Sequence, residues 1–119
     1  MTLRTPDSQP RDWYGWATNQ AGHFAIVGAP AAVALLGLGV PAAAVPILLG
    51  ALYATVWEGV LQAPNDPADA LSDTAHVCAG AIFACAALVW GYWPTVAVLA
   101  LWAVMLAAGI LSRLAGGRT

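Results

Sequence analysis

Apolar residues fill four long stretches of the chain, and short breaks separate them. The stretches cover roughly residues 18–40, 41–61, 67–90 and 95–114. A helix needs about 20 apolar residues to cross a membrane, so each stretch is long enough for one span. Residues 18–61 would make a single span about twice too long, and Pro41 suits the first turn of a new helix. The pattern therefore predicts four membrane-spanning helices, paired as two hairpins.

The charged residues and histidines all lie at one end of these predicted helices. They are Arg4, Asp7, Arg11, Asp12, His23, Glu58, Asp66, Asp69, Asp73, His76, Arg113 and Arg118. The breaks at the other end, residues 37–41 and 91–94, carry no charge. A soluble protein spreads charges over its whole surface. The sequence therefore predicts an all-α fold, an integral membrane four-helix bundle of two transmembrane hairpins with one polar face.

The composition agrees with a membrane protein and argues against a nucleic-acid-binding protein. The chain is 61% hydrophobic and 8% charged, whereas an ordinary globular domain is about 25% charged. Its net charge is −2 and it contains no lysine, which argues against nucleic acid as a partner because nucleic acid needs a basic patch. The predicted partner is the lipid bilayer, and contacts in a homo-oligomer or with other proteins of a membrane complex stay open.

The arginines set the expected orientation. Residues 1–17 are predicted to be a cytoplasmic tail that ends in interfacial aromatic residues, Trp13, Tyr14 and Trp16. Residues 18–114 form the single transmembrane domain, and residues 115–119 form a second cytoplasmic tail. All four arginines lie in the terminal segments, and arginine accumulates on the cytoplasmic side of membrane proteins. We therefore expect the bacterial inner (cytoplasmic) membrane, with both termini and the acidic loop in the cytoplasm.

The third helix carries the clearest local signals. Asp66 can cap it, Pro67 fits its first position, and Asp69 favours the positive end of the helix dipole. Cys78 and Cys85 are seven residues apart on this helix, a rise of about 10 Å. A disulfide needs Cα atoms within about 7 Å, so the two cysteines are predicted to stay unbridged.

Polar residues from three helices are expected at a similar depth. Ionisable groups inside a membrane are costly and usually face inward, where they are paired or hydrated. The predicted site is a cytoplasm-facing polar pocket that binds a lipid headgroup, a small molecule or an ion. Its candidate binding residues are Asn19, His23, Glu58, Gln62, Asp73 and His76.

Structural roles for the same residues stay open. Glu58 can pair with Arg113 and fix the second helix against the fourth, and Asp73 can pair with His76 within one helix. Trp102 in the middle of the fourth helix is interpreted as a packing or lipid-facing ring, with an oligomer contact as the alternative.

Neither a metal site nor a catalytic residue is predicted. Two imidazoles and several carboxylates have the chemistry to hold a divalent metal, but the chain has no HExxH or similar ligand motif. It also has no Gly-x-Ser-x-Gly motif and no phosphate-binding loop. The sequence therefore indicates no cofactor and leaves the question of an enzymatic activity open.

The chain resembles the VanZ-like family of small four-helix membrane proteins over roughly residues 12–85. The residues that carry the resemblance are His23-Phe24, Glu58, Gln62, Pro64, Asp69, Asp73 and Gly80, in that order. The chain departs from the family pattern where His76 stands near the place of an asparagine, and no arginine follows Pro64. The resemblance implies a four-helix topology and an envelope or glycopeptide-resistance context, without a defined chemistry.

Two other functions fit the same composition. A phage holin-type lesion former would share the small size, the hydrophobicity and the short polar tails, and it would act by oligomerising. A small accessory subunit of a larger membrane complex would use its aromatic and small-residue faces to bind partner proteins.

Overall fold

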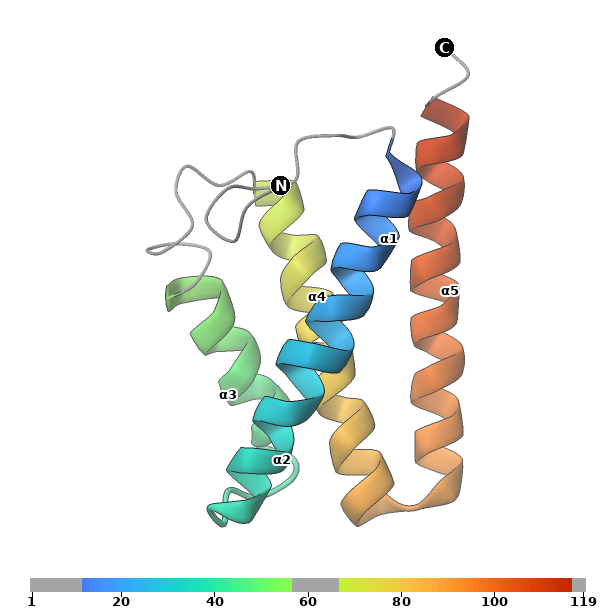
Figure 1. The fold of residues 1–119 in the computed structure, drawn as a ribbon. Helices are drawn as coiled ribbons and strands as arrows, with labels where there is room; N and C mark the ends of the chain where they lie inside the picture. The colour runs from blue at the N-terminus through green and yellow to red at the C-terminus, as the bar shows by residue number, and fades with distance from the viewer. Residues whose placement is uncertain (1–11, 57–66, 117–119) are drawn as a thin grey trace.

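The computed structural model describes residues 12–56 and 67–116, and within these ranges the chain forms four helices and no β-strand (Figure 1). The first helix is continuous through α1 (Trp13–Gly22), a wide π-helical segment η1 (His23–Gly28) and α2 (Ala29–Gly37). The second contains α3 (Val45–Leu52). The third joins α4 (Pro67–Cys85) to a second π-helical segment, η3 (Ala86–Trp90), and the fourth is α5 (Tyr92–Gly116).

The first helix begins five residues before the predicted residue 18. Asp12 caps it, because an Oδ1 atom of its carboxylate accepts a hydrogen bond from the Gly15 N–H at 2.8 Å. Trp13 and Trp16 therefore belong to the helix and not to a tail. The η1 segment ends two residues before Pro30, whose ring lacks an N–H and disturbs the preceding helical turn.

The second helix begins later than predicted. Pro41 lies in the turn, where its carbonyl accepts hydrogen bonds from the N–H groups of Ala44 and Val45, and Pro46 occupies the first turn of the helix instead. Gly39 permits the turn, since its φ is +90°. The rest of the predicted second helix, with Glu58 and Gln62, lies outside the described residues.

The second half of the chain follows the prediction closely. The third helix covers Pro67 to Trp90 as predicted, with Asp69 in its first turn; the expected cap, Asp66, lies outside the described residues. The break is shorter than predicted because Gly91 alone, at φ +109°, reverses the chain. The last helix therefore begins at Tyr92 rather than at Thr95.

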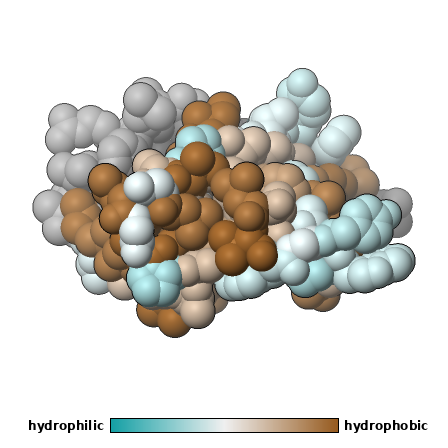
Figure 2. Space-filling view, turned by 90° about the horizontal axis from the view of Figure 1, so that it is seen from below, coloured by the Kyte–Doolittle hydropathy of each residue, from teal (hydrophilic) through white to brown (hydrophobic). Residues whose placement is uncertain are grey.

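The helix α4 lies centrally, with α3 and α5 on opposite sides and the first helix crossing it (Figure 1). The α2–α3 turn and the turn that leads into α5 lie at one end of the molecule, here called the turn end (Figure 1). The starts of α1 and α4 and the end of α5 lie at the opposite end, here called the polar end (Figure 1). Viewed from the turn end, hydrophobic residues occupy the middle of the surface, and weakly hydrophilic residues lie to one side (Figure 2).

Three helices are long and apolar enough to cross a membrane by length and composition. They are Trp13–Gly37, Ala68–Trp90 and Tyr92–Ala115. The described part of the second helix, Val45–Val56, is apolar but shorter. The predicted all-α fold with four helices is therefore confirmed.

Small residues let the first helix and α4 approach closely. A Cβ atom on Gly28 would collide with the Val77 carbonyl oxygen, and one on Gly80 would collide with the Phe24 carbonyl oxygen. Such contacts between backbones are the usual way to pack helices tightly where lipid removes the hydrophobic driving force. This crossing places the side chains of His23 and Asp73, described next, on facing surfaces.

The two cysteines are free, as predicted. Cys85 belongs to the buried core with Ala32, Val45 and Ala81. Its thiol lies 3.6 Å from the Ala42 carbonyl oxygen. It packs as a small apolar residue.

Candidate functional site

A buried carboxylate is the centre of the candidate site. Asp73 on α4 is only 2% exposed. One of its oxygens, Oδ1, accepts a hydrogen bond of 2.7 Å from the side-chain amide of Gln20. The other, Oδ2, lies 3.5 Å from the Nε2 atom of His23. A carboxylate removed from water is costly unless it is paired and hydrogen-bonded, and these two contacts from the first helix satisfy that condition.

The hydrogen bonds of His23 define where its protons lie. Its Nδ1 atom is 2.7 Å from the Asn19 carbonyl oxygen, and a carbonyl only accepts, so Nδ1 carries a hydrogen. Its Nε2 atom faces Asp73. One further proton held between Nε2 and the carboxylate makes the pair electrically neutral, whichever of the two groups carries it. A neutral pair costs less to bury than an uncompensated charge.

The second histidine has a different partner. His76 is buried, and its Nδ1 atom accepts a hydrogen bond of 2.8 Å from the indole N–H of Trp102. The Trp102 ring stacks on Phe24, with 4.0 Å between ring centroids. The packing interpretation of Trp102 is therefore confirmed. Asp73 contacts Gln20 and His23, and its pairing with His76 stays a prediction.

An aromatic contact brings α5 to the site. The Trp16 ring is buried and fills the space left by Gly109, where a Cβ atom would collide with it. The guanidinium of Arg113 lies over this ring, 4.1 Å from its centroid, a cation–π arrangement. His76 meets the same ring edge-on at 5.6 Å between centroids.

Tyr53 connects the second helix to the same cluster. Its ring is nearly buried and meets the His23 ring edge-on, with 5.6 Å between centroids. Side chains from all four helices thus meet at the polar end, in what we call the polar cluster: Trp16, Gln20, His23, Tyr53, Asp73, His76, Trp102 and Arg113.

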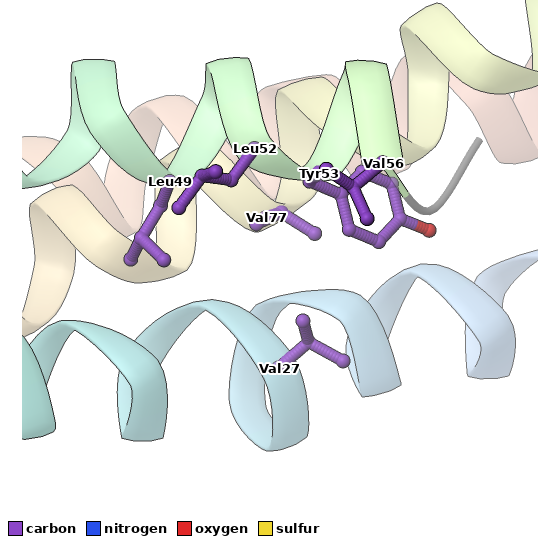
Figure 3. Close-up of a pocket in the computed structure, with 6 residues that line it drawn as sticks. All are labelled: Val27, Leu49, Leu52, Tyr53, Val56 and Val77. Carbon is purple, nitrogen blue, oxygen red and sulfur yellow. The ribbon is translucent and has the colours of Figure 1, made fainter. Parts of the chain in front are cut away.

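An apolar groove continues from the polar cluster towards the turn end (Figure 3). Its volume is about 320 Å³, and its walls come from the first helix, the second helix and α4. The lining residues are Val27, Leu49, Leu52, Tyr53, Val56 and Val77. Tyr53 lines the groove and also touches His23, so the groove and the polar cluster are contiguous.

Several buried polar atoms of this region have no hydrogen-bond partner among the described residues. They include the indole Nε1 of Trp16, the Oε1 of Gln20 and the Oγ1 of Thr74. An unpartnered buried donor or acceptor costs about 1–3 kcal/mol. Bound water or a polar ligand normally removes this cost.

The structure brings some of the predicted site residues together. His23 and Asp73 are in direct contact, and Asn19 takes part through its backbone carbonyl. His76 lies one turn along α4 and joins through Trp16 and Trp102. Glu58 and Gln62 lie outside the described residues, so their predicted roles stay predictions.

Sequence reasoning missed Gln20, Trp16 and Tyr53. Gln20 and Trp16 lie three and seven residues before His23, so Gln20, Trp16 and His23 share one face of the first helix. This spacing is the signal that could have identified Gln20 and Trp16, whereas the residue selected from the sequence was Asn19, four residues before His23. Tyr53 carries no comparable signal, since one tyrosine in an apolar helix is ordinary.

The donor set of the cluster suits binding by hydrogen bonds. In the part of the chain that the structure describes, no group of three or more His, Cys, Asp or Glu side chains is arranged to hold a metal ion. The cluster instead combines amide, imidazole, indole, phenol and carboxylate groups. No family model, no curated protein and no solved structure matches the chain, so the resemblance to the VanZ-like family stays a prediction.

Proposed function

We propose that the protein is an integral membrane protein of two transmembrane hairpins whose polar end binds the headgroup of a membrane lipid. The observation that carries this proposal is the buried Asp73 carboxylate, held by Gln20 and His23 between helices whose outer faces are apolar. Ionisable groups at such positions generally serve binding or transport.

The distribution of aromatic residues supports the membrane part of the proposal. Tyr92 and Trp93 are exposed at the turn end, and Trp13 and Tyr14 are exposed at the polar end. Tryptophan and tyrosine gather at the two interfaces of a bilayer. By the positive-inside rule, the arginines of the terminal segments favour the polar end as the cytoplasmic side of a bacterial inner membrane.

A purely structural role explains the polar cluster less well. Apolar residues of similar volume are often at least as stabilising as a buried ion pair, so packing alone does not require one. The unpartnered Nε1 of Trp16 and Oε1 of Gln20 are also costly unless another molecule binds them. A headgroup with donors and acceptors supplies what these atoms lack. The resemblance to the VanZ-like family, with its envelope context, is compatible with the same proposal.

The test is lipid retention after gentle extraction. The protein is purified in mild detergent from membranes, and bound phospholipid is counted by native mass spectrometry. The wild type is expected to carry a phospholipid, and Asp73→Asn, which replaces the carboxylate that faces His23 by a neutral amide, is expected to lose most of it. The control is Asp12→Asn, since the exposed Asp12 caps α1 and asparagine caps equally well. Equal retention by wild type and Asp73→Asn would refute the proposal.

The same measurement addresses the other two functions. A lesion former would be seen as a large ring, and an accessory subunit would copurify with other proteins. Either result together with unchanged lipid content in Asp73→Asn would leave the polar cluster as a structural feature.

A further inference from the structure

We propose that the apolar groove holds one hydrocarbon chain of the lipid whose headgroup lies at the polar cluster. This inference rests on the function proposed above and names the class of ligand as an amphipathic lipid. It assigns the headgroup to the surroundings of His23, Tyr53 and Asp73, and the chain to the groove between η1 and α3.

The register of the helices aligns the two halves of the site. Val27 follows His23 by four residues, and Val77 follows Asp73 by four residues. Residues four apart lie on the same helical face, one turn further along. The groove therefore begins one turn beyond the His23–Asp73 contact on both helices, and a ligand reaching from one to the other needs a polar end and an apolar end.

Tyr53 marks the boundary between the two halves. Figure 3 shows its ring among the lining side chains, with Leu49 towards the opposite end of the groove and the hydroxyl directed away from Leu49. The same ring packs edge-on against His23. A phenol with an apolar body and a polar tip suits the place where a lipid changes from headgroup to chain.

The size and lining of the groove suit a hydrocarbon chain. A volume of about 320 Å³ is at the lower end of the range for small-molecule pockets, and a single flexible chain of methylene groups can follow such a groove. All lining side chains except that of Tyr53 are aliphatic.

Charge guides the choice of the headgroup used as a probe. Among the described residues, α4 carries two acids near the polar end, Asp69 and Asp73, against one arginine on α5, Arg113. An ammonium group complements this excess and forms charge-assisted hydrogen bonds to carboxylates. Phosphatidylethanolamine carries such a group on a headgroup that also has a phosphate acceptor for the unpartnered indole N–H of Trp16.

The experiment is photo-crosslinking in lipid nanodiscs. The full chain is reconstituted in phosphatidylcholine with a small share of phosphatidylethanolamine that carries a photoactivatable group in one acyl chain. Crosslinked residues are located by mass spectrometry. In the wild type we expect labelling at Val27, Leu49 and Leu52.

Bulky substitutions at the rim distinguish lipid bound in the groove from lipid that contacts the rest of the apolar surface. Val27 is 39% exposed, so Val27→Trp can place its ring in the groove without entering the core. Displacing two or more methylenes from the groove should lower the crosslinking yield about tenfold. Ile26→Trp is the matched control, because Ile26 is the neighbouring residue, is 76% exposed and does not line the groove. We expect it to leave the yield unchanged.

A second pair of variants on α3 tests whether a reduced yield reflects a folding defect. Leu52→Trp fills the groove from α3, and Ile47→Trp is its control on the exposed side of the same helix. Helical content by circular dichroism and elution as a single species verify that each variant is folded. If either folded groove variant retains the wild-type yield, or if the control variants lose as much as the groove variants, the inference is wrong.

Asp73→Asn distinguishes failure of this inference from failure of the proposed function. If Asp73→Asn lowers the yield and the groove variants do not, the headgroup site stands and the chain lies elsewhere. If neither Asp73→Asn nor the groove variants change the yield, both proposals are wrong.

Discussion

The Nε2 atom of His23 lies 3.5 Å from the Oδ2 atom of Asp73 and joins the first helix to α4 within the polar cluster. Nδ1 of His23 donates to the Asn19 carbonyl, so Nε2 is the ring nitrogen that faces the carboxylate. Gln20 adds a third group from the first helix. The bundle thus positions one carboxylate by two side chains of the facing helix, at the end of an apolar groove.

Removing the carboxylate should destabilise the fold. Asp73→Ala leaves the Gln20 amide buried without its acceptor and His23 without its partner, and breaking a buried pair in this way costs about 3–5 kcal/mol. Thermal and denaturant unfolding in a fixed detergent measures the loss. Asp73→Asn should lose less, since its amide oxygen still accepts from Gln20. Equal stability of Asp73→Ala and wild type would contradict the buried arrangement.

The glycine contacts between η1 and α4 give a second prediction. In Gly28→Ala the new methyl group collides with the Val77 carbonyl oxygen, so the two helices must separate and the protein should lose about 1–3 kcal/mol. Gly22→Ala is the matched control on the same helix, since a Cβ there meets nothing within 4 Å. Alanine at that position should stabilise the helix by about 0.5–1 kcal/mol. Relative to the wild type, the free energy of unfolding should decrease in Gly28→Ala and increase in Gly22→Ala.

The boundaries of two helices illustrate what is and what is not predictable from the sequence. The stretch from Pro67 to Trp90 was predicted correctly because proline and glycine bound it and apolar residues fill it. The start of the first helix is not predictable from the apolar pattern alone, because Asp12 stands in a polar segment and its side chain caps that helix.

The partners of the polar residues were harder to predict than the helices. Gln20 reaches Asp73 because of the depth at which η1 and α4 cross. The two backbones meet at Gly28 and Gly80, and no spacing within one helix reveals that depth. The same holds for the contact between Trp102 and His76.

The indole of Trp102 should be important for its hydrogen bond as well as for its size. Trp102→Phe keeps a ring to stack on Phe24 but removes the donor to His76, so we expect a loss of about 1–3 kcal/mol from the unpartnered imidazole nitrogen. Unfolding in detergent measures it. Trp93→Phe serves as the control, because Trp93 is exposed at the turn end. If both variants lose the same amount, the hydrogen bond does not contribute to stability.

The transmembrane arrangement predicts a definite labelling pattern. With Cys78 and Cys85 replaced by alanine, Leu38→Cys and Trp93→Cys should react with a membrane-impermeant maleimide added outside intact cells, since both positions are exposed at the turn end. Leu114→Cys, exposed near the end of α5, should react only after lysis. Labelling of Leu38→Cys and Leu114→Cys from the same side would rule out the hairpins.

The central claim is that a lipid headgroup lies against His23, and histidine nitrogen NMR tests it most directly. The protein, labelled with ¹⁵N at its two histidines, is compared in nanodiscs of phosphatidylcholine alone and in nanodiscs that also contain phosphatidylethanolamine. The account predicts a saturable shift of the His23 resonances, a much smaller shift for His76, whose Nδ1 is occupied by Trp102, and no shift of His23 in Asp73→Asn. Resonances of His23 that are the same in both lipids would contradict it.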